Sequence, residues 1–393
     1  MMICSVIASL VLTLATASCD SLEEDDGRSP IKTLRFGDMM GAETTYELFD
    51  NQESKTIRVT DPTGHMTTYV LDDLANSCDS GDVDGCYNLG IAYQRLAAMH
   101  EATRDEEDAM RQALAAAGTA FQHGCEGDQA EACHELGLSY AAGRHVKQDW
   151  VRAAELYAKA CQIGHANSCN DLGSRYFSGT GVAKNVQQAN ALYEQACDDG
   201  SSTGCLNLGL SYKDGAGVPR DLAKTAALLQ RACDGNVAIG CGYLGDQYSA
   251  GIGVPQNSST ALALYEKSCI SGRPEDCTKL GISFARGLGV ERDYVRSASL
   301  LEMSCRAGDP NGCASLGSLY RTGSGVEQDT QEALALLGRA CEAGAATGCN
   351  DLGVMFDEGL GVERDAALAA ELFAKACDGG SRIGCNNLSK SRN

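Results

Sequence analysis

The sequence has no cluster of five or more Lys or Arg residues, and its acidic residues outnumber its basic residues by 53 to 32. The formal net charge of −21 disfavours binding to nucleic acid or to anionic lipid surfaces, because both are negatively charged. It leaves room for a cationic partner, and it also keeps an extended surface soluble. Aromatic residues are scarce, at 6% of the chain, so Ala and Gly must fill much of the core.

A hydrophobic run long enough to cross a membrane is also missing from the first residues. The apolar run from Ile3 to Ala17 is shorter than the roughly 20 residues that a membrane span requires. It has the length of the hydrophobic region of a signal peptide, although no Lys or Arg precedes it. We therefore expect a signal peptide over residues 1–18 and an exported protein.

Two cleavage sites stay open. Ala15-Thr16-Ala17 fits ordinary cleavage before Ser18, whereas Thr16-Ala17-Ser18-Cys19 resembles a bacterial lipoprotein box with Thr in the usual Leu position. Removal of Cys4 with the signal peptide leaves Cys19 beside eighteen cysteines that pair among themselves, so ordinary cleavage would leave an unpaired thiol in an oxidising space. This parity favours lipidation of Cys19 in the periplasm or outer membrane, with plain secretion as the alternative.

The composition then changes twice before the repeats begin. Residues 19–30 are acidic and lack apolar periodicity, which predicts a flexible tether. Within residues 31–72, three β-branched or aromatic runs are separated by turn residues: Thr44–Phe49, Lys55–Val59 and Met66–Val70. We expect a small antiparallel β-meander of three or four strands that packs against the helices that follow.

From residue 73 to 393 the chain repeats itself, and cysteine marks the repeat. Cys-x7-Cys pairs recur every 36 residues from Cys125; the first step, from Cys78, is 47, because eleven extra residues lie between Tyr93 and Ala115. Zinc and iron-sulfur sites usually gather cysteines at C-x2-C-like spacing, so we expect disulfides, with no metal and no cofactor. The expected bridges are Cys78–Cys86, Cys125–Cys133, Cys161–Cys169, Cys197–Cys205, Cys233–Cys241, Cys269–Cys277, Cys305–Cys313, Cys341–Cys349 and Cys377–Cys385.

Apolar residues within each unit have helical spacing. Leu172, Gly173 and Tyr176 follow Cys169 by three, four and seven residues, which places them on one face of a helix, here called helix A. A Gly-x-Gly-Val stop ends helix A, and helix B runs to the next cysteine pair. Each pair then joins the end of helix B to the start of the next helix A. The polar end after Cys385 predicts a capping helix.

The pattern Cys-x2-Leu-Gly-x2-Tyr, followed by Gly-x-Gly-Val and an Ala-rich helix B, is similar to the Sel-1-like repeat, and its cysteine pairs resemble those of the Helicobacter cysteine-rich proteins. The resemblance covers about Ser77 to Leu388; it departs at Gly143 to Val146, in the insertion and in the β-rich segment. It implies a tetratricopeptide-like all-α fold, a right-handed α/α solenoid of about eight hairpins, here with the small N-terminal β-meander. It also implies a monomer that binds a protein or peptide on its concave face.

Some members of this family are labelled as penicillin-binding or β-lactamase proteins, which makes a hydrolase the alternative function. The S-x-x-K motif of such enzymes matches only Ser29-Pro30-Ile31-Lys32, at the end of the tether, and S-D-N, K-T-G, G-x-S-x-G and H-E-x-x-H do not occur. We assign no catalytic residues.

Three further groups of residues bear on function. His123, His134, His145 and His165 fall around the second repeat but lack metal-ligand spacing on one helix, so we assign them no site. A stripe of aromatic residues is expected in the core: Tyr140, Tyr176, Tyr212, Tyr248, Phe284, Tyr320 and Phe356. Variable positions suit a binding surface that differs between repeats: Tyr87-Asn88, His134-Glu135, Leu206-Asn207, Gly242-Tyr243 and Ala314-Ser315.

Overall fold

The computed structural model describes residues 17–18, 30, 32–37, 43–51, 54–102, 107–144 and 146–391. Cys19, Ser29, and most of the expected signal peptide and tether lie outside the described residues. The chain divides into an N-terminal unit, Met1–Pro219, and a C-terminal unit, Arg220–Asn393. Each unit is described by itself.

A β-meander begins the N-terminal unit, as the sequence predicts. Its strands are β1 (Ala17–Ser18), β2 (Lys32–Gly37), β3 (Glu43–Asn51), β4 (Ser54–Thr60) and β5 (Met66–Val70). They follow one another in the sheet in chain order, and all neighbours are antiparallel. The three runs read from the sequence are β3, β4 and β5. The additional strand β2 lies just before them, and the short strand β1 falls in the expected signal peptide.

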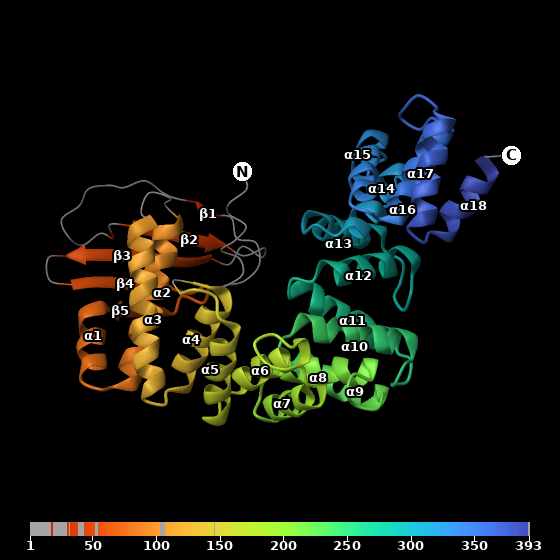
Figure 1. Cartoon of the computed structure of the whole chain (residues 1–393). Coiled ribbons are helices and arrows are strands. Elements are labelled where there is room, and N and C mark those ends of the chain that lie inside the picture. The colour runs from red at the N-terminus through yellow and green to blue at the C-terminus, as the bar shows by residue number, and fades with distance from the viewer. Residues whose placement is uncertain are drawn as a thin grey trace. The chain divides into compact units, whose positions relative to one another are not determined.

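One face of the sheet packs against the first helices. Leu48, Ile57 and Val59 are buried on this face, and Leu48 lies opposite Ile57 in the β3–β4 register. They share a hydrophobic cluster with residues of the first three helices. Figure 1 shows α2 and α3 running across the strands. The guanidinium of Arg95, on α2, lies 5.2 Å from the Tyr69 ring centroid, which adds a cation–π contact to this junction.

The rest of the described chain consists of eighteen helices that alternate between types B and A. Helices B carry the first cysteine of each pair and are α1 (Leu71–Asp79), α3 (Glu107–Glu126), α5 (Trp150–Gln162), α7 (Val186–Asp198), α9 (Leu222–Asp234), α11 (Ser258–Ile270), α13 (Tyr294–Arg306), α15 (Thr330–Glu342) and α17 (Ala366–Asp378). Helices A carry the second cysteine and are α2 (Val83–Ala102), α4 (Ala130–Ala142), α6 (Ala166–Ser178), α8 (Ser202–Asp214), α10 (Ala238–Ala250), α12 (Pro274–Arg286), α14 (Pro310–Thr322), α16 (Ala346–Glu358) and α18 (Arg382–Ser391). The fold class expected from the sequence, a disulfide-linked α/α repeat with a small β-meander, is confirmed.

The insertion in the first repeat lengthens its helices. α2 and α3 have 20 residues each, whereas helices α4 to α17 have 13. Residues 103–106, between α2 and α3, lie outside the described residues. The eleven extra residues therefore add helical turns to the hairpin that covers the sheet.

Local sequence sets where each helix starts and stops. Every helix B from α5 onward begins after an Asp or Asn whose side chain accepts a backbone N–H of the first turn, as Asp149 does for α5. Helices A from α4 to α16 end at a glycine in the left-handed region, for example Gly179 with φ of 80°. The second glycine of the stop serves close packing as well, because a Cβ at Gly181 would overlap the carbonyl of Trp150.

Helices A and B pack closely within a hairpin. The Gly173 backbone of α6 lies under the ring of Tyr193 from α7, and Leu172 and Leu192 of the same hairpin lie in one buried cluster. The chain turns from each helix B to the next helix A through a residue with positive φ, three positions after the first cysteine. It is glycine except at Asp128 and Asn236. Asp and Asn are among the side chains that best tolerate this conformation.

Candidate functional site

All cysteines of the described chain are in disulfides. The nine bridges are those expected from the spacing, each with a sequence separation of 8 and Cα atoms 4.4 to 4.8 Å apart. Each joins the last turn of a helix B to the first turn of the next helix A. These sulfur atoms are therefore structural links, and the described residues present no thiolate for catalysis or metal binding.

The surface of helices A is lined by one residue per repeat, two positions after the second cysteine. We call these residues the surface row: Asn88, Glu135, Asp171 and Asn207 in the N-terminal unit, and Tyr243, Lys279, Ser315, Asp351 and Asn387 in the C-terminal unit. Asn88 is exposed and the others are half-buried. The row brings a different side chain to the surface at almost every repeat.

Only part of the variable surface expected from the sequence is accessible. In each pair the second residue belongs to the surface row. The first is buried in three of the five pairs, with Leu206 7% and Ala314 2% exposed and Gly242 also buried, whereas Tyr87 and His134 are half-buried. The residue directly after the second cysteine fills space at the contact with a neighbouring repeat. The expectation that both residues of each pair face a ligand is therefore wrong for the buried residues.

Hydrogen bonds tie the surface row to neighbouring repeats. Asn207 Nδ2 donates to Asn170 Oδ1 at 2.7 Å, and the same contact recurs in the C-terminal unit, where Asn387 Nδ2 donates to Asn350 Oδ1 at 2.9 Å. The ammonium of Lys279 lies 2.6 Å from an Asp246 carboxylate oxygen. These contacts fix the row side chains in place, which lowers the entropy lost when a ligand binds.

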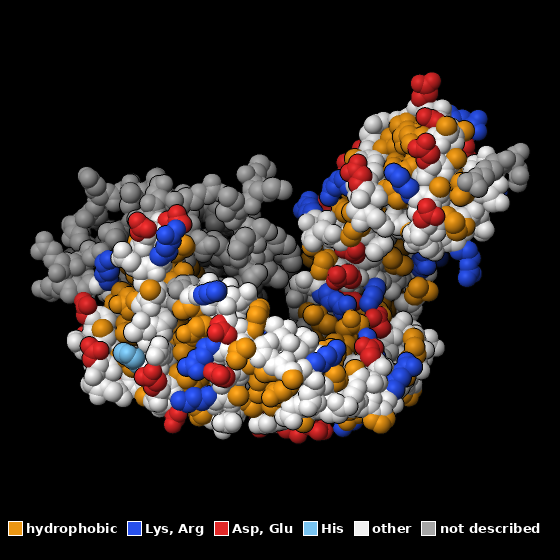
Figure 2. Space-filling model, in the orientation of Figure 1, with side chains coloured by type: hydrophobic (Ala, Val, Ile, Leu, Met, Phe, Trp, Pro, Cys, Tyr) orange, Lys and Arg blue, Asp and Glu red, His pale blue; other side chains and the backbone are white. Residues whose placement is uncertain are grey.

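Two carboxyl groups of the row are poorly solvated. Burial raises the pKa of Asp171 to about 6, against a hydrogen bond from Asn170 that lowers it. Burial likewise raises the pKa of Glu135, although Gln94 Nε2 donates to its Oε2 at 3.1 Å. Figure 2 shows acidic and basic side chains interspersed over the face in view. Glu135 and Asp171 differ from such exposed charges. Burial destabilises their ionised forms, and a cation bound beside either carboxylate would stabilise the ionised form again.

Two of the four clustered histidines meet beside this row. The His134 and His165 ring centroids lie 4.5 Å apart, and each Nδ1 lies 2.8 Å from Ser168 Oγ. Burial, followed by the proximity of His165, lowers the pKa of His134 to about 4; burial also lowers the pKa of His165. His123 is exposed on α3, and His145 lies outside the described residues. The imidazoles of His134 and His165 are therefore neutral at pH 7.

The cluster resembles a Ser-His-Asp arrangement in composition but not in access. Asp171 Oδ2 lies 3.8 Å from His134 Nδ1, and Ser168 is completely buried. A substrate cannot reach a hydroxyl in that position, so the cluster does not form a nucleophilic site. Nor do the described residues contain three or more His, Cys, Asp or Glu side chains arranged to hold a metal ion.

A second polar cluster lies in the C-terminal unit around Asp276. This side chain is completely buried; its Oδ2 lies 3.1 Å from Arg273 Nη1, its Oδ1 lies 3.0 Å from Lys279 Nζ, and Ser268 Oγ donates to it at 2.6 Å. A Cβ at Gly242 would overlap the Arg273–Asp276 pair. The glycine thus makes room for an ion pair that holds Lys279 in the surface row.

One position in the repeat marks both polar clusters in the sequence, although it was not among the residues singled out above. Ser168 and Asp276 occupy the position directly before the second cysteine. All seven other repeats have Gly or Ala there: Gly85, Ala132, Gly204, Gly240, Gly312, Gly348 and Gly384. A polar side chain in a column of small buried residues indicates a partner in a neighbouring repeat, since buried polar groups are hydrogen-bonded.

The aromatic stripe of helices A is less buried than expected. Phe284 is 8% exposed, but the remaining six residues of the stripe are half-buried at the edge of the core. The fully packed aromatic residues come from helices B. Tyr193 and Tyr265 are buried, and their hydroxyls reach Ser174 and Asp246 on the neighbouring helices A.

Comparison with known families identifies the repeat. The Sel1 repeat model matches seven consecutive segments: residues 130–165, 166–201, 202–237, 238–272, 274–309, 310–344 and 346–381. These segments cover more than half of the chain. No curated protein sequence matches.

Solved structures agree with this match. A protective antigen of uropathogenic Escherichia coli strains, displaying an SLR fold, is 27% identical with a TM-score of 0.70; the match covers 81% of this chain and 66% of that protein, so the chain spans slightly less than two thirds of its length. A Sel1 repeat protein from Oxalobacter formigenes is 26% identical with a TM-score of 0.55, over 81% of this chain and 89% of that one. Cysteine rich protein B of Helicobacter pylori matches 35% of this chain and 96% of its own, at 29% identity and a TM-score of 0.25.

Proposed function

The chain belongs to the Sel1 repeat family, and from that premise we propose that it is an exported, lipid-anchored scaffold whose helices A bind a protein or peptide in the cell envelope. A scaffold of Sel1 repeats is consistent with a role in protein–protein interaction. The observation that carries the proposal is the surface row. It combines a constant helical frame with side chains that change from repeat to repeat, as a surface specific for one extended ligand requires.

Export is supported by the cysteine chemistry. Nine disulfides are typical of a non-reducing extracellular or periplasmic environment, because cytosolic thiols are kept reduced. Within the part of the chain that the structure describes, no helix is long and apolar enough to cross a membrane. The anchor in this proposal is a lipid on Cys19. It is supported by the odd number of cysteines that follow Cys4, because Cys19 has no disulfide partner left once the other eighteen have paired.

The proposed ligand carries positive charge where it meets the N-terminal unit. Glu135 and Asp171 occupy the same position of consecutive helices A, and burial raises the pKa of both. A Lys or Arg side chain of the ligand would stabilise their ionised forms and be attracted by the net charge of −21.

The binding test uses the oxidised full-length protein and a panel of extended peptides that differ only in charge. We expect Lys- and Arg-containing peptides to bind, and Glu135→Gln with Asp171→Asn to weaken their affinity at least tenfold. Asn is the natural residue at this position in the next repeat, Asn207. The control is Glu155→Gln, which removes an exposed charge from the helix B α5. Equal affinities for both variants would contradict the proposal.

The anchor is tested separately by expression in a Gram-negative host. We expect the wild-type protein in the membrane fraction, with the mass of a diacylglycerol on an N-terminal Cys19. Cys19→Ser should be soluble in the periplasm, whereas Cys4→Ser, inside the expected signal peptide, should stay membrane-bound. Membrane association of Cys19→Ser would exclude this anchor without affecting the proposed binding surface.

A further inference from the structure

The two buried imidazoles of the N-terminal unit are part of a directional hydrogen-bond chain. His165 is the N-cap of α6, where its Nδ1 accepts the backbone N–H of Ser168 at 3.2 Å, and its carbonyl oxygen lies 3.0 Å from the same nitrogen. Nδ1 of His165 therefore carries no proton. The Ser168 hydroxyl has one hydrogen, so it donates to His165, and His134 Nδ1–H donates to Ser168 Oγ. The chain links α4 to the first turn of α6.

A proton on His165 breaks the cap bond of this chain and reverses the direction of the next one. Protonated Nδ1 is a donor only, so it can accept neither the Ser168 N–H nor the Ser168 hydroxyl. The new positive charge would also lie at the N-terminus of α6, where the helix dipole disfavours cations. Both effects favour an open state in which the imidazole turns to water and the first turn of α6 is uncapped.

The charges around the imidazoles do not reverse this effect. Glu131 on α4 raises the pKa of His165, but less than burial lowers it. The other ionisable groups around the pair are Glu135 on α4, Arg144 in the following loop, Tyr157 on α5, Asp171 and Arg175 on α6, and Tyr193 on α7. Asp171, whose Oδ2 lies 3.8 Å from His134, is the nearest carboxyl group.

We propose that His165, His134 and Ser168 form an acid-operated joint, which holds the repeats of α4 and α6 together at neutral pH and releases the first turn of α6 on acidification. The joint is specific to this place in the chain. The equivalent N-cap positions of the other 13-residue helices A are Gln129, Ser201, Val237, Arg273, Asp309 and Ala345. None of these is an imidazole. The surface row residue Asp171 lies in the second turn of α6, so opening would also disturb the proposed binding face.

The experiment measures amide hydrogen exchange of Ser168 and Cys169, the two hydrogen-bonded amides of this turn, in the oxidised protein between pH 7.5 and 4.5, corrected for the intrinsic pH dependence of exchange. We expect protection to fall by up to about tenfold per pH unit below pH 6.5, as for one proton taken up on opening. The amide of Gly384 in α18, which donates to Ser381 Oγ at 3.1 Å, is the internal control and should not change. Unchanged protection of Ser168 and Cys169 would overturn the proposal.

Matched variants assign the effect to His165. His165→Ser installs the cap that Ser201 provides one repeat later, and it should make protection independent of pH. His123→Ser removes an exposed imidazole from α3 and should behave like the wild type. Acid-induced opening that persists in His165→Ser would contradict the proposal that protonation of His165 releases the first turn of α6.

A second measurement does not depend on a folded variant. In the wild-type protein, the NMR titrations of the His165 ring and of the Ser168 backbone amide should have one common midpoint. Different midpoints would show that protonation of the ring does not release the cap.

Discussion

Lys159 Nζ lies 2.6 Å from the carbonyl oxygen of Cys125, so the ammonium of one helix B caps the C-terminus of the preceding helix B. The contact recurs in the C-terminal unit, where Lys267 Nζ lies 2.6 Å from the carbonyl oxygen of Cys233. A cation at this end complements the helix dipole and the carbonyl groups that lack partners within the helix. Hydrogen bonds from a Lys ammonium to a helix C-terminus therefore help to hold successive helices B together in both units.

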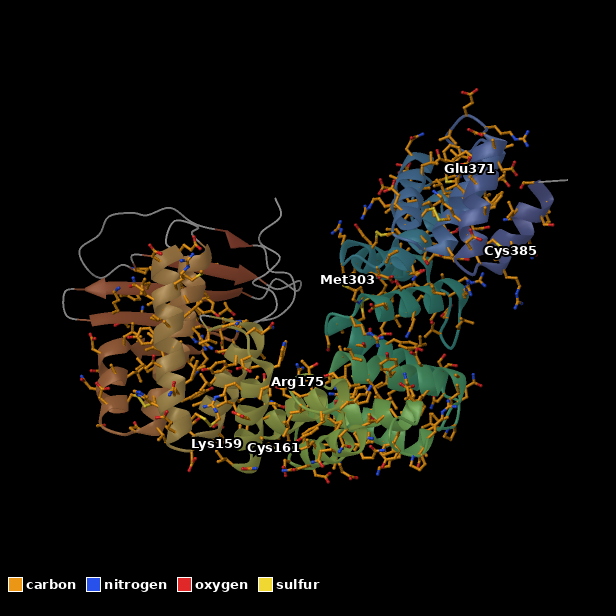
Figure 3. All side chains as sticks on the ribbon, viewed as in Figure 1. Lys159, Cys161, Arg175, Met303, Glu371 and Cys385 are labelled. Carbon is orange, nitrogen blue, oxygen red and sulfur yellow. A yellow bond between two sulfur atoms is a disulfide. The ribbon has the colours of Figure 1, made fainter. Side chains whose placement is uncertain are left out.

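Lys159→Met removes this cap and copies the residue at the equivalent position of a later repeat, Met303, which Figure 3 labels together with Lys159. We expect the free energy of unfolding, measured with urea, to fall by about 1 kcal/mol. The adjacent pair of Lys159 with Asp128, at 2.8 Å, is more exposed and should contribute less. Asp128→Asn is therefore the control, and a loss equal to that of Lys159→Met would mean that the carbonyl bond contributes nothing.

The sequence predicts the local features of the repeat better than the contacts between repeats. Cys169, Leu172 and Tyr176 mark a helix because period and spacing are local properties of the chain. The meeting of His134 and His165 depends on contacts between repeats, and their separation of 31 residues matches no ligand motif. The contact can be recognised only in the folded chain, where the start of one helix A lies beside the start of the next.

Burial was predicted less well than secondary structure. Leu206 and Tyr212 both have helical spacing, yet Leu206 is buried and Tyr212 is half-buried. The 3.6-residue period defines a face but does not say which part of that face the neighbouring repeat covers. Asp276 shows the same limit, because the ion pair that it forms with Arg273 fits only beside Gly242 of the preceding repeat.

Close contact between helices predicts opposite effects for two glycines. A Cβ at Gly245 would lie 2.7 Å from Tyr265 Cε1 and 3.3 Å from the Ala261 carbonyl oxygen, whereas a Cβ at Gly338 meets nothing within 4 Å. Gly245→Ala should cost about 2 kcal/mol through overpacking. Gly338→Ala, within α15, should add up to about 1 kcal/mol through helix propensity. Thermal unfolding measures both, and destabilisation by Gly338→Ala would refute the reasoning.

The disulfides should differ in how fast they are reduced. Cys233 and Cys241 are 1% and 0% exposed, whereas Cys377 and Cys385 of the last repeat are half-buried. Exchange requires a thiolate to reach a sulfur atom, so Cys377–Cys385 should open first under limiting reductant. Differential alkylation and peptide mass spectrometry give the order, and earlier reduction of Cys233–Cys241 would contradict it. Loss of either bridge should cost about 2.5 kcal/mol on the chain-entropy model.

The pH dependence of stability provides the last prediction, because Asp171 and His134 act in opposite directions. The pKa of Asp171 is raised to about 6 in the folded protein, so its contribution is present at low pH and is lost as the pH rises through 6. The pKa of His134 is lowered to about 4, so its contribution is present above pH 6.5 and is lost as the pH falls through 4. Between pH 4 and 6 these two contributions largely cancel, and His165, whose pKa is also lowered by burial, adds to the contribution of His134.

Substitutions made in a His165→Ser background, which removes the third shifted group, should separate these contributions. In Asp171→Asn, the free energy of unfolding should fall by about 1 kcal/mol per pH unit on acidification from pH 6 to 4, below the limit of about 1.4 kcal/mol for one fully desolvated group. In His134→Asn, which copies Asn170 of the next repeat, it should rise over the same range. Urea unfolding at several pH values measures both slopes. Slopes of the same sign would show that burial does not displace the two pKa values in opposite directions, whereas opposite slopes would locate the compensation in this pair.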